Sequence, residues 1–191
     1  MQALLVVDAQ NEFSAAGKRP VANHASAIVA IRRFADIARR ENRPIAWVRH
    51  YNRPHESPAF VPGTWGSELS PGFGPQEGRS TERLFEKDVY GAFTETGLEP
   101  WLRDLGVDEV LVAGFYTHMC LSTSVREALI RGFEVVIDPD GTGARDLEDA
   151  QLGTLSAAEV RRSALLQLVD MGARIESSTS QWAEGRTPAR T

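Results

Sequence analysis

The chain of 191 residues contains one cysteine, Cys120, so it cannot form an internal disulfide. Such a composition is typical of a protein in a reducing compartment, and we expect a cytoplasmic location. No apolar run approaches the roughly 20 residues that cross a bilayer. The opening segment MQALLVVDAQNEF lacks a basic region and a small-residue cleavage site. It therefore predicts a strand rather than a signal peptide.

The chain also lacks a concentration of basic residues. It has 21 Lys and Arg against 26 Asp and Glu, a formal net charge of −5. Nucleic acid and anionic membranes are therefore not expected as partners. Hydrophobic residues make up 42% of the chain, which is enough for a sizeable core. We expect one domain over residues 1–176, followed by a polar C-terminal tail over residues 177–191.

Apolar, strand-like runs alternate with helical runs along the chain. A long loop rich in Pro, Gly and Ser is expected over residues 51–80. The alternation predicts an α/β fold in which helices cover both faces of a parallel sheet. The expected strands are residues 3–7, 44–50, 83–87, 109–114, 133–138 and 173–177, and the expected helices are residues 24–42, 98–106, 120–132 and 156–172.

Three chemically active side chains follow predicted strands. Asp8 comes directly after LLVV, Lys87 ends RLFEK, and Cys120 lies just beyond EVLVAG. Ligands bind at the carboxyl ends of strands in such sheets, so we expect the three to share one edge. There a helix N-terminus and the ammonium would favour the thiolate, and the carboxylate could carry a proton. A lone cysteine can also be a small buried hydrophobe, and that alternative stays open.

Four segments resemble the isochorismatase-like cysteine hydrolase superfamily, in its amidohydrolase branch. They are LLVVDAQNEF, GTWGSEL, FEKDVYGAF and GFYTHMCLSTSVREALIRGFEVVIDPDG. The resemblance covers residues 3 to about 175. It implies one three-layer α/β domain with a six-stranded parallel sheet. It also implies hydrolysis of C–N bonds in small amide, ureido or N-carbamoyl compounds through a thioester, and a homo-oligomer, either a dimer or a tetramer.

The resemblance also implies roles for individual residues. Cys120 would be the nucleophile, Asp8 the general base and Lys87 the third catalytic residue. The backbone N–H groups of Tyr116 and Cys120 would form the oxyanion hole, with a cis peptide bond between Phe115 and Tyr116.

Aromatic residues in or beside the strand-end segments are candidates to line a substrate pocket. Arg49, His50 and Arg53 lie at or just after the end of the predicted strand 44–50 and could meet an anionic substrate group. The candidate aromatic residues are Phe13, Trp65, Tyr90, Phe93 and Tyr116.

No cofactor and no metal are expected. Relatives that bind metal carry a D-x-H motif after the second strand. This chain has VRHYNRPHES there, with His50 and His55 but no aspartate. The segment GTGARD lacks the third glycine of a dinucleotide fingerprint and predicts a turn. There is no G-x-S-x-G serine-nucleophile motif.

Two alternative functions remain open. An isochorismatase-type vinyl ether hydrolase would need Asp8 and Lys87 but not the thiol. A non-catalytic binding or thiol-sensing protein of the same fold would have a reactive Cys120 without turnover.

Overall fold

The computed structural model describes residues 1–53 and 55–176 of the chain. The tail predicted over residues 177–191 lies outside the described residues, so its boundary stays a prediction. The strands are β1 (Gln2–Val7), β2 (Ile45–His50), β3 (Glu82–Lys87), β4 (Glu109–Phe115), β5 (Glu134–Gly143), β6 (Leu147–Asp149), β7 (Gly153–Leu155) and β8 (Arg174–Ile175). The α-helices are α1 (His24–Arg40), α2 (Leu98–Asp104), α3 (Ser122–Ile130) and α4 (Ala157–Asp170).

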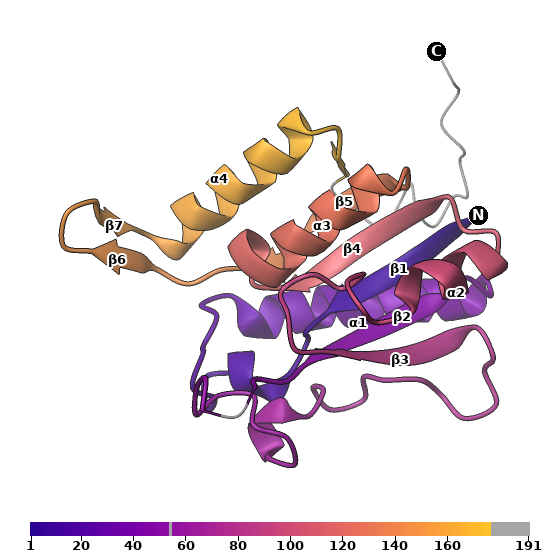
Figure 1. Cartoon of the computed structure of the whole chain (residues 1–191), viewed down its shortest axis with the longest axis horizontal. Helices are drawn as coiled ribbons and strands as arrows, with labels where there is room; N and C mark the ends of the chain where they lie inside the picture. The colour runs from indigo at the N-terminus through magenta and orange to yellow at the C-terminus, as the bar shows by residue number, and fades with distance from the viewer. Residues whose placement is uncertain (54, 177–191) are drawn as a thin grey trace.

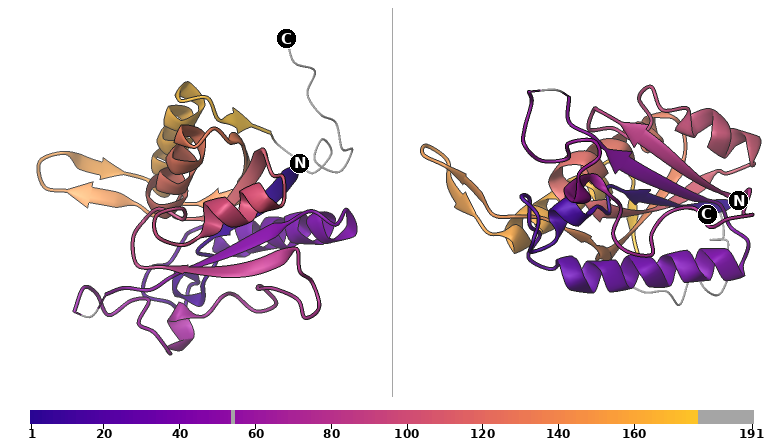
Figure 2. Two further views of the ribbon diagram at one scale, coloured as in Figure 1. Left: turned by 45° about the vertical axis from the view of Figure 1, so that its right-hand side comes forward. Right: turned by 90° about the horizontal axis from the view of Figure 1, so that it is seen from below.

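Six strands form one parallel sheet in the order β3-β2-β1-β4-β5-β8 (Figure 1). Helix α1 lies against one face, and α2, α3 and α4 cover the other (Figure 2). The predicted α/β fold with a six-stranded parallel sheet and helices on both faces is confirmed. The long loop after β2 is also confirmed, with one short 3₁₀ turn, η2 (Trp65–Ser67), inside it.

The side chains of β1 are apolar on both faces of the sheet because both faces are buried. Leu5 and Val7 enter the core under α2 and α3, whereas Leu4 and Val6 enter the core under α1. Successive side chains of a strand point to opposite faces, so a central strand buried on both faces has no polar alternation.

Two features of the structure were not predicted. The antiparallel hairpin β6–β7 projects from the body of the domain (Figure 2). Its strands are short and largely exposed, so they carry no periodic apolar pattern. Strand β5 continues to Gly143. The prediction of a turn at GTGARD was therefore wrong for Gly141 and Gly143, which lie in the strand. The pairing register of β4 and β5 shifts after Val112, and this lets β5 resume pairing beyond Pro139.

Gly114 allows β4 to approach β1 closely just before the segment that carries Cys120. Its φ is +127°, and a Cβ there would lie 1.8 Å from the carbonyl oxygen of Val7. Only glycine adopts this conformation without strain and without that clash.

A buried ion pair ties α1 to β3, and it provides a test of stability. Arg39 donates from Nε to Oε1 of Glu82 at 2.9 Å and from Nη2 to Oε2 at 3.0 Å. Trp47 donates from Nε1 to the same carboxylate at 3.2 Å. Burial alone would raise the pKa of Glu82, but the hydrogen bonds from Arg39 and Trp47 outweigh it, and the pKa is lowered.

We expect Glu82→Gln to reduce the free energy of unfolding by about 3 kcal/mol at neutral pH, because Arg39 loses its buried partner. A lowered pKa stabilises the fold above the ordinary glutamate pKa of about 4.3, and this contribution disappears as pH falls through the folded-state pKa. Urea denaturation should therefore show the difference from the unmodified protein shrinking in acid. Glu86→Gln, at an exposed pair with Arg49, is the matched control and should cost less than about 1 kcal/mol. Equal losses in both variants would contradict the prediction.

Candidate active site

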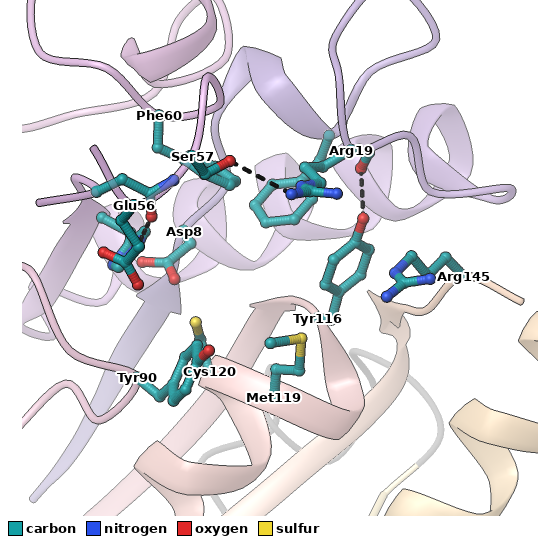
Figure 3. A pocket seen from close by; sticks show the side chains of 13 residues that line it. Asp8, Arg19, Glu56, Ser57, Phe60, Tyr90, Tyr116, Met119, Cys120 and Arg145 are labelled. Carbon is teal, nitrogen blue, oxygen red and sulfur yellow. Dashed lines mark hydrogen bonds between the residues drawn. The ribbon is translucent and has the colours of Figure 1, made fainter. Parts of the chain in front are cut away.

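The three predicted catalytic side chains lie together at the carboxyl edge of the sheet: Asp8 and Cys120 line one cavity (Figure 3), and Lys87 pairs with Asp8. Asp8 follows β1, Lys87 ends β3, and Cys120 lies in a π-helical turn, η3 (Thr117–Leu121), between β4 and α3. Strand β2 separates β1 from β3, and Lys87 reaches across it. Its Nζ donates to Oδ2 of Asp8 at 2.8 Å, and neither side chain is exposed to solvent.

Asp8 has a strained backbone and one unused carboxylate oxygen. Its φ is +54°, in the left-handed region that few residues other than glycine enter. Such strain persists only where the surroundings enforce it, and it is common at functional sites. Oδ1 of Asp8 is buried and has no hydrogen-bond partner within residues 1–53 and 55–176. Lys87 thus fixes one oxygen, and the other is free to accept a proton.

Cys120 is buried, with only 7% of its surface exposed. Burial raises the pKa of the thiol, the Asp8 carboxylate raises it further, and the Lys87 ammonium offsets part of the effect. The ammonium favours the thiolate, as expected, but burial and the carboxylate together outweigh it. The thiol is protonated at neutral pH, and it needs a base when it attacks.

Lys87 remains a cation despite its burial. Burial alone would lower the pKa of Lys87, but the Asp8 carboxylate outweighs it, and the pKa is raised. Nζ also donates to the carbonyl oxygen of Val89 at 3.1 Å and lies 3.5 Å from Nδ1 of His50. An ammonium cannot accept a hydrogen bond, so Nδ1 of His50 must be the acceptor. Nε2 of His50 then donates to Oδ1 of Asn52 at 2.9 Å.

The two histidines considered as metal ligands lie in different environments. His50 is buried beside Lys87, whereas His55 is exposed in the loop after β2. Among the described residues, no group of three or more His, Cys, Asp or Glu side chains could hold a metal ion. Activity without a metal stays a prediction.

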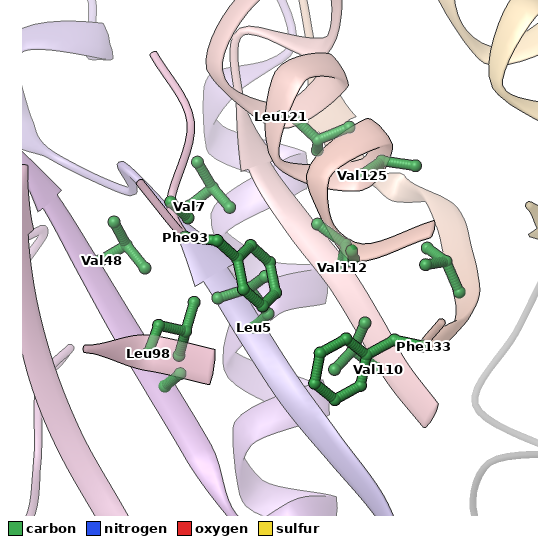
Figure 4. Packing of buried hydrophobic residues seen from close by; sticks show 14 of the residues in the cluster. Leu5, Val7, Val48, Phe93, Leu98, Val110, Val112, Leu121, Val125 and Phe133 are labelled. Carbon is green, nitrogen blue, oxygen red and sulfur yellow. The ribbon is translucent and has the colours of Figure 1, made fainter. Parts of the chain in front are cut away.

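A cavity of about 280 Å³ opens above the thiol, and three of the five predicted aromatic residues line it. These are Phe13, Tyr90 and Tyr116. Trp65 lies outside this cavity, on η2, with half of its surface exposed. Phe93 also lies outside it, because it packs against Phe133 in the core beneath α3 (Figure 4). Trp65 and Phe93 are therefore not part of the proposed site.

The isochorismatase domain model matches residues 2–170. The chain belongs to the isochorismatase family. It is 34% identical over 171 residues to nicotinamidase 3 of Arabidopsis thaliana, covering 81% of this chain and 80% of the relative. It is 30% identical over 175 residues to a secreted isochorismatase effector of Verticillium dahliae, covering 92% and 87%. A cysteine hydrolase structure from Pseudomonas syringae superposes with a TM-score of 0.86 at 25% identity, covering 96% and 91%.

No helix within the described part of this family member is long and apolar enough to cross a membrane. The cytoplasmic location stays a prediction.

Several pocket residues of this isochorismatase-family protein were not predicted. Most belong to the loops after β1 and β2, where no periodic pattern exists to place them. Arg145 could have been found if β5 had been extended, since it follows the true end of that strand. The residues missed are Arg19, Asn52, Glu56, Ser57, Phe60, Met119 and Arg145.

The arginines expected after β2 have other partners. Arg49 pairs with Glu86, and Arg53 pairs with Asp88 at 2.8 Å. Neither lines the cavity above the thiol.

Tyr116 links the nucleophile segment to the opposite wall of the cavity. The Phe115–Tyr116 peptide bond is cis, as the resemblance implied. The Tyr116 hydroxyl donates to the carbonyl oxygen of Arg19 at 2.8 Å. Burial raises the pKa of Tyr116 to about 12, although Arg145 and Arg19 lower it. The phenol is therefore a neutral donor at physiological pH.

Proposed function

We propose that this isochorismatase-family protein is a cysteine hydrolase of a C–N bond in a small amide, ureido or N-carbamoyl compound. The observation that carries the proposal is the Asp8 carboxylate. One of its oxygens is held by Lys87, and the other is buried and unpaired in the cavity that Cys120 also lines. The similarity to a nicotinamidase and to a cysteine hydrolase supports the same chemistry.

Acylation begins with attack of the Cys120 sulfur on the substrate carbonyl. Asp8 accepts the thiol proton at Oδ1, which the raised thiol pKa makes necessary. The N–H groups of Tyr116 and Cys120 hold the oxyanion, each contributing roughly 3 kcal/mol. Asp8 then passes the proton to the leaving nitrogen. The C–N bond breaks, ammonia or an amine departs, and a thioester remains on Cys120.

Deacylation uses the same carboxylate. Asp8 accepts a proton from a water molecule as the water oxygen attacks the thioester. The C–S bond breaks, the acid product leaves, and the proton returns to the Cys120 sulfur. Lys87 holds Oδ2 of Asp8 and so orients the carboxylate in both steps.

A panel of primary amides, ureido acids and N-carbamoyl amino acids, assayed for ammonia, tests this function. We expect release of ammonia from at least one of these classes. A slow substrate should leave an acyl mass on Cys120, located by mass spectrometry of the intact protein and its peptides. Absence of turnover across all three classes would contradict the proposal.

Lys87→Met should raise the pKa of the Cys120 thiol further, because the ammonium is the group that lowers it. The rate of alkylation by iodoacetamide, measured against pH, should shift to higher pH. Lys18→Met is the matched control, since the Lys18 side chain is exposed and its Nζ donates to the carbonyl oxygen of Pro58. An unchanged alkylation profile in Lys87→Met would mean that Lys87 does not act on the thiol.

A further inference from the structure

The cavity above Cys120 has charges of opposite sign on its two sides (Figure 3). Asp8 and Glu56 lie on one side. Arg19 and Arg145 lie on the other, beside the ring of Tyr116. A ligand that fills the cavity therefore meets carboxylates at one end and guanidinium groups at the other.

Arg19 is exposed, yet three hydrogen bonds hold it at the rim. Its backbone N–H donates to the carbonyl oxygen of Glu12 at 3.0 Å. Its own carbonyl oxygen accepts from the Tyr116 hydroxyl, and its Nη2 donates to Oγ of Ser57 at 3.3 Å. The two backbone bonds fix the point from which the side chain extends, and the bond to Ser57 directs the guanidinium, which reduces the entropic cost of binding.

Arg145 reaches the same place from the carboxyl end of β5. Its guanidinium carbon lies 6.0 Å from the centre of the Tyr116 ring. Its Nη1 donates to the carbonyl oxygen of Asp146 at 3.1 Å. Arg19 and Arg145 are far apart in the sequence, yet both lie near the Tyr116 phenol. Each lowers the pKa of Tyr116, although burial raises that pKa by more.

Neither guanidinium forms an ion pair with a carboxylate of the described residues. Arg49 and Arg53, which do not line this cavity, are each paired. The positive charge at this rim is therefore available to a ligand. A carboxylate suits it, because guanidinium groups bind carboxylates in planar, charge-assisted hydrogen bonds.

We propose that Arg19 and Arg145 form an anion subsite, and that the substrate is an amide or ureido compound bearing a carboxylate. This inference rests on the proposed function, with the scissile carbonyl at Cys120 and the carboxylate beside Tyr116. An N-carbamoyl amino acid has both groups within a molecule small enough for a cavity of about 280 Å³.

The sole cysteine allows a test that needs no hydrolysis. Iodoacetate and iodoacetamide differ in charge and alkylate the same thiol. In Arg19→Gln/Arg145→Gln, the ratio of the iodoacetate rate to the iodoacetamide rate should fall about fivefold, the scale of one exposed charge contact. Arg162→Gln, on α4 and outside the cavity, should leave the ratio unchanged. An unchanged ratio in the double variant, or an equal fall in a double control of Arg161→Gln/Arg162→Gln, would overturn the subsite.

Equilibrium binding separates this inference from the proposed function. Calorimetry on Cys120→Ala protein should show N-carbamoylglycine binding more tightly than its methyl ester. The Arg19→Gln and Arg145→Gln changes should abolish that preference. Equal binding of acid and ester to Cys120→Ala would reject the anion subsite even if hydrolysis is proven. Loss of the preference on removing the arginines would support the subsite even if the thiol proves dispensable.

Discussion

Cys120→Ala should lose hydrolysis of amide and ureido substrates by on the order of 10⁵-fold in kcat. The sulfur is the atom that forms the thioester, and nothing else near Asp8 in the described structure is a comparable nucleophile. Any residual rate would come from carbonyl polarisation by backbone N–H groups and from substrate positioning. The measurement is ammonia release under saturating substrate, compared with the unmodified protein.

The fold should survive this change. Cys120 packs beside Leu121 and Val125 in the core under α3, and removing one sulfur atom should cost only about 1 kcal/mol. Urea denaturation checks that cost. Cys120→Ser is the companion variant, because it keeps the shape of the side chain but supplies a weaker nucleophile.

Two other results of these assays would each favour one of the alternative functions. Full activity of Cys120→Ala on a vinyl ether substrate, with dependence on Asp8 and Lys87, would favour the vinyl ether hydrolase. A thiol that reacts with iodoacetamide in a protein that turns over no amide would favour the thiol-sensing protein.

The fold was predictable where the sequence has an apolar pattern. The run around Leu5 and the helix around Phe34 are buried in the cores on the two faces of the sheet, so burial itself produces their patterns. The hairpin around Leu152 is exposed and left no such pattern. The extension of β5 beyond Pro139 was missed because proline and glycine interrupt the strand signal there.

The candidate site was predictable only in part for a related reason. Asp8, Lys87 and Cys120 adjoin strands, so the topology of a parallel sheet brings them to one edge. Arg19 lies in a loop, and its position depends on a hydrogen bond to Tyr116, 97 residues away along the chain. The protonation of the thiol depends on burial, which the sequence around Cys120 does not reveal.

Asp8→Asn should lose hydrolysis as severely as Cys120→Ala, because one carboxylate moves the proton in both half-reactions. The amide keeps nearly the same shape but cannot accept the thiol proton. Loss of the Asp8 carboxylate also leaves the ammonium of Lys87 buried without its ion-pair partner, which should cost about 3–5 kcal/mol of folding stability.

The stability loss must be separated from the catalytic loss, and the buried pair provides the means. Asp8→Asn/Lys87→Met removes both charges, so we expect it to regain most of the stability that Asp8→Asn loses. It should regain no activity. Recovery of hydrolysis together with stability would show that Asp8 only supports the fold.

Alkylation provides a readout that a structural role alone would not change. The Asp8 carboxylate raises the pKa of the Cys120 thiol, so its removal should lower that pKa. At mildly alkaline pH, folded Asp8→Asn protein should therefore react faster with iodoacetamide while it hydrolyses no substrate. A thiol that reacts at the unmodified rate, in a variant that still releases ammonia, would remove Asp8 from the mechanism.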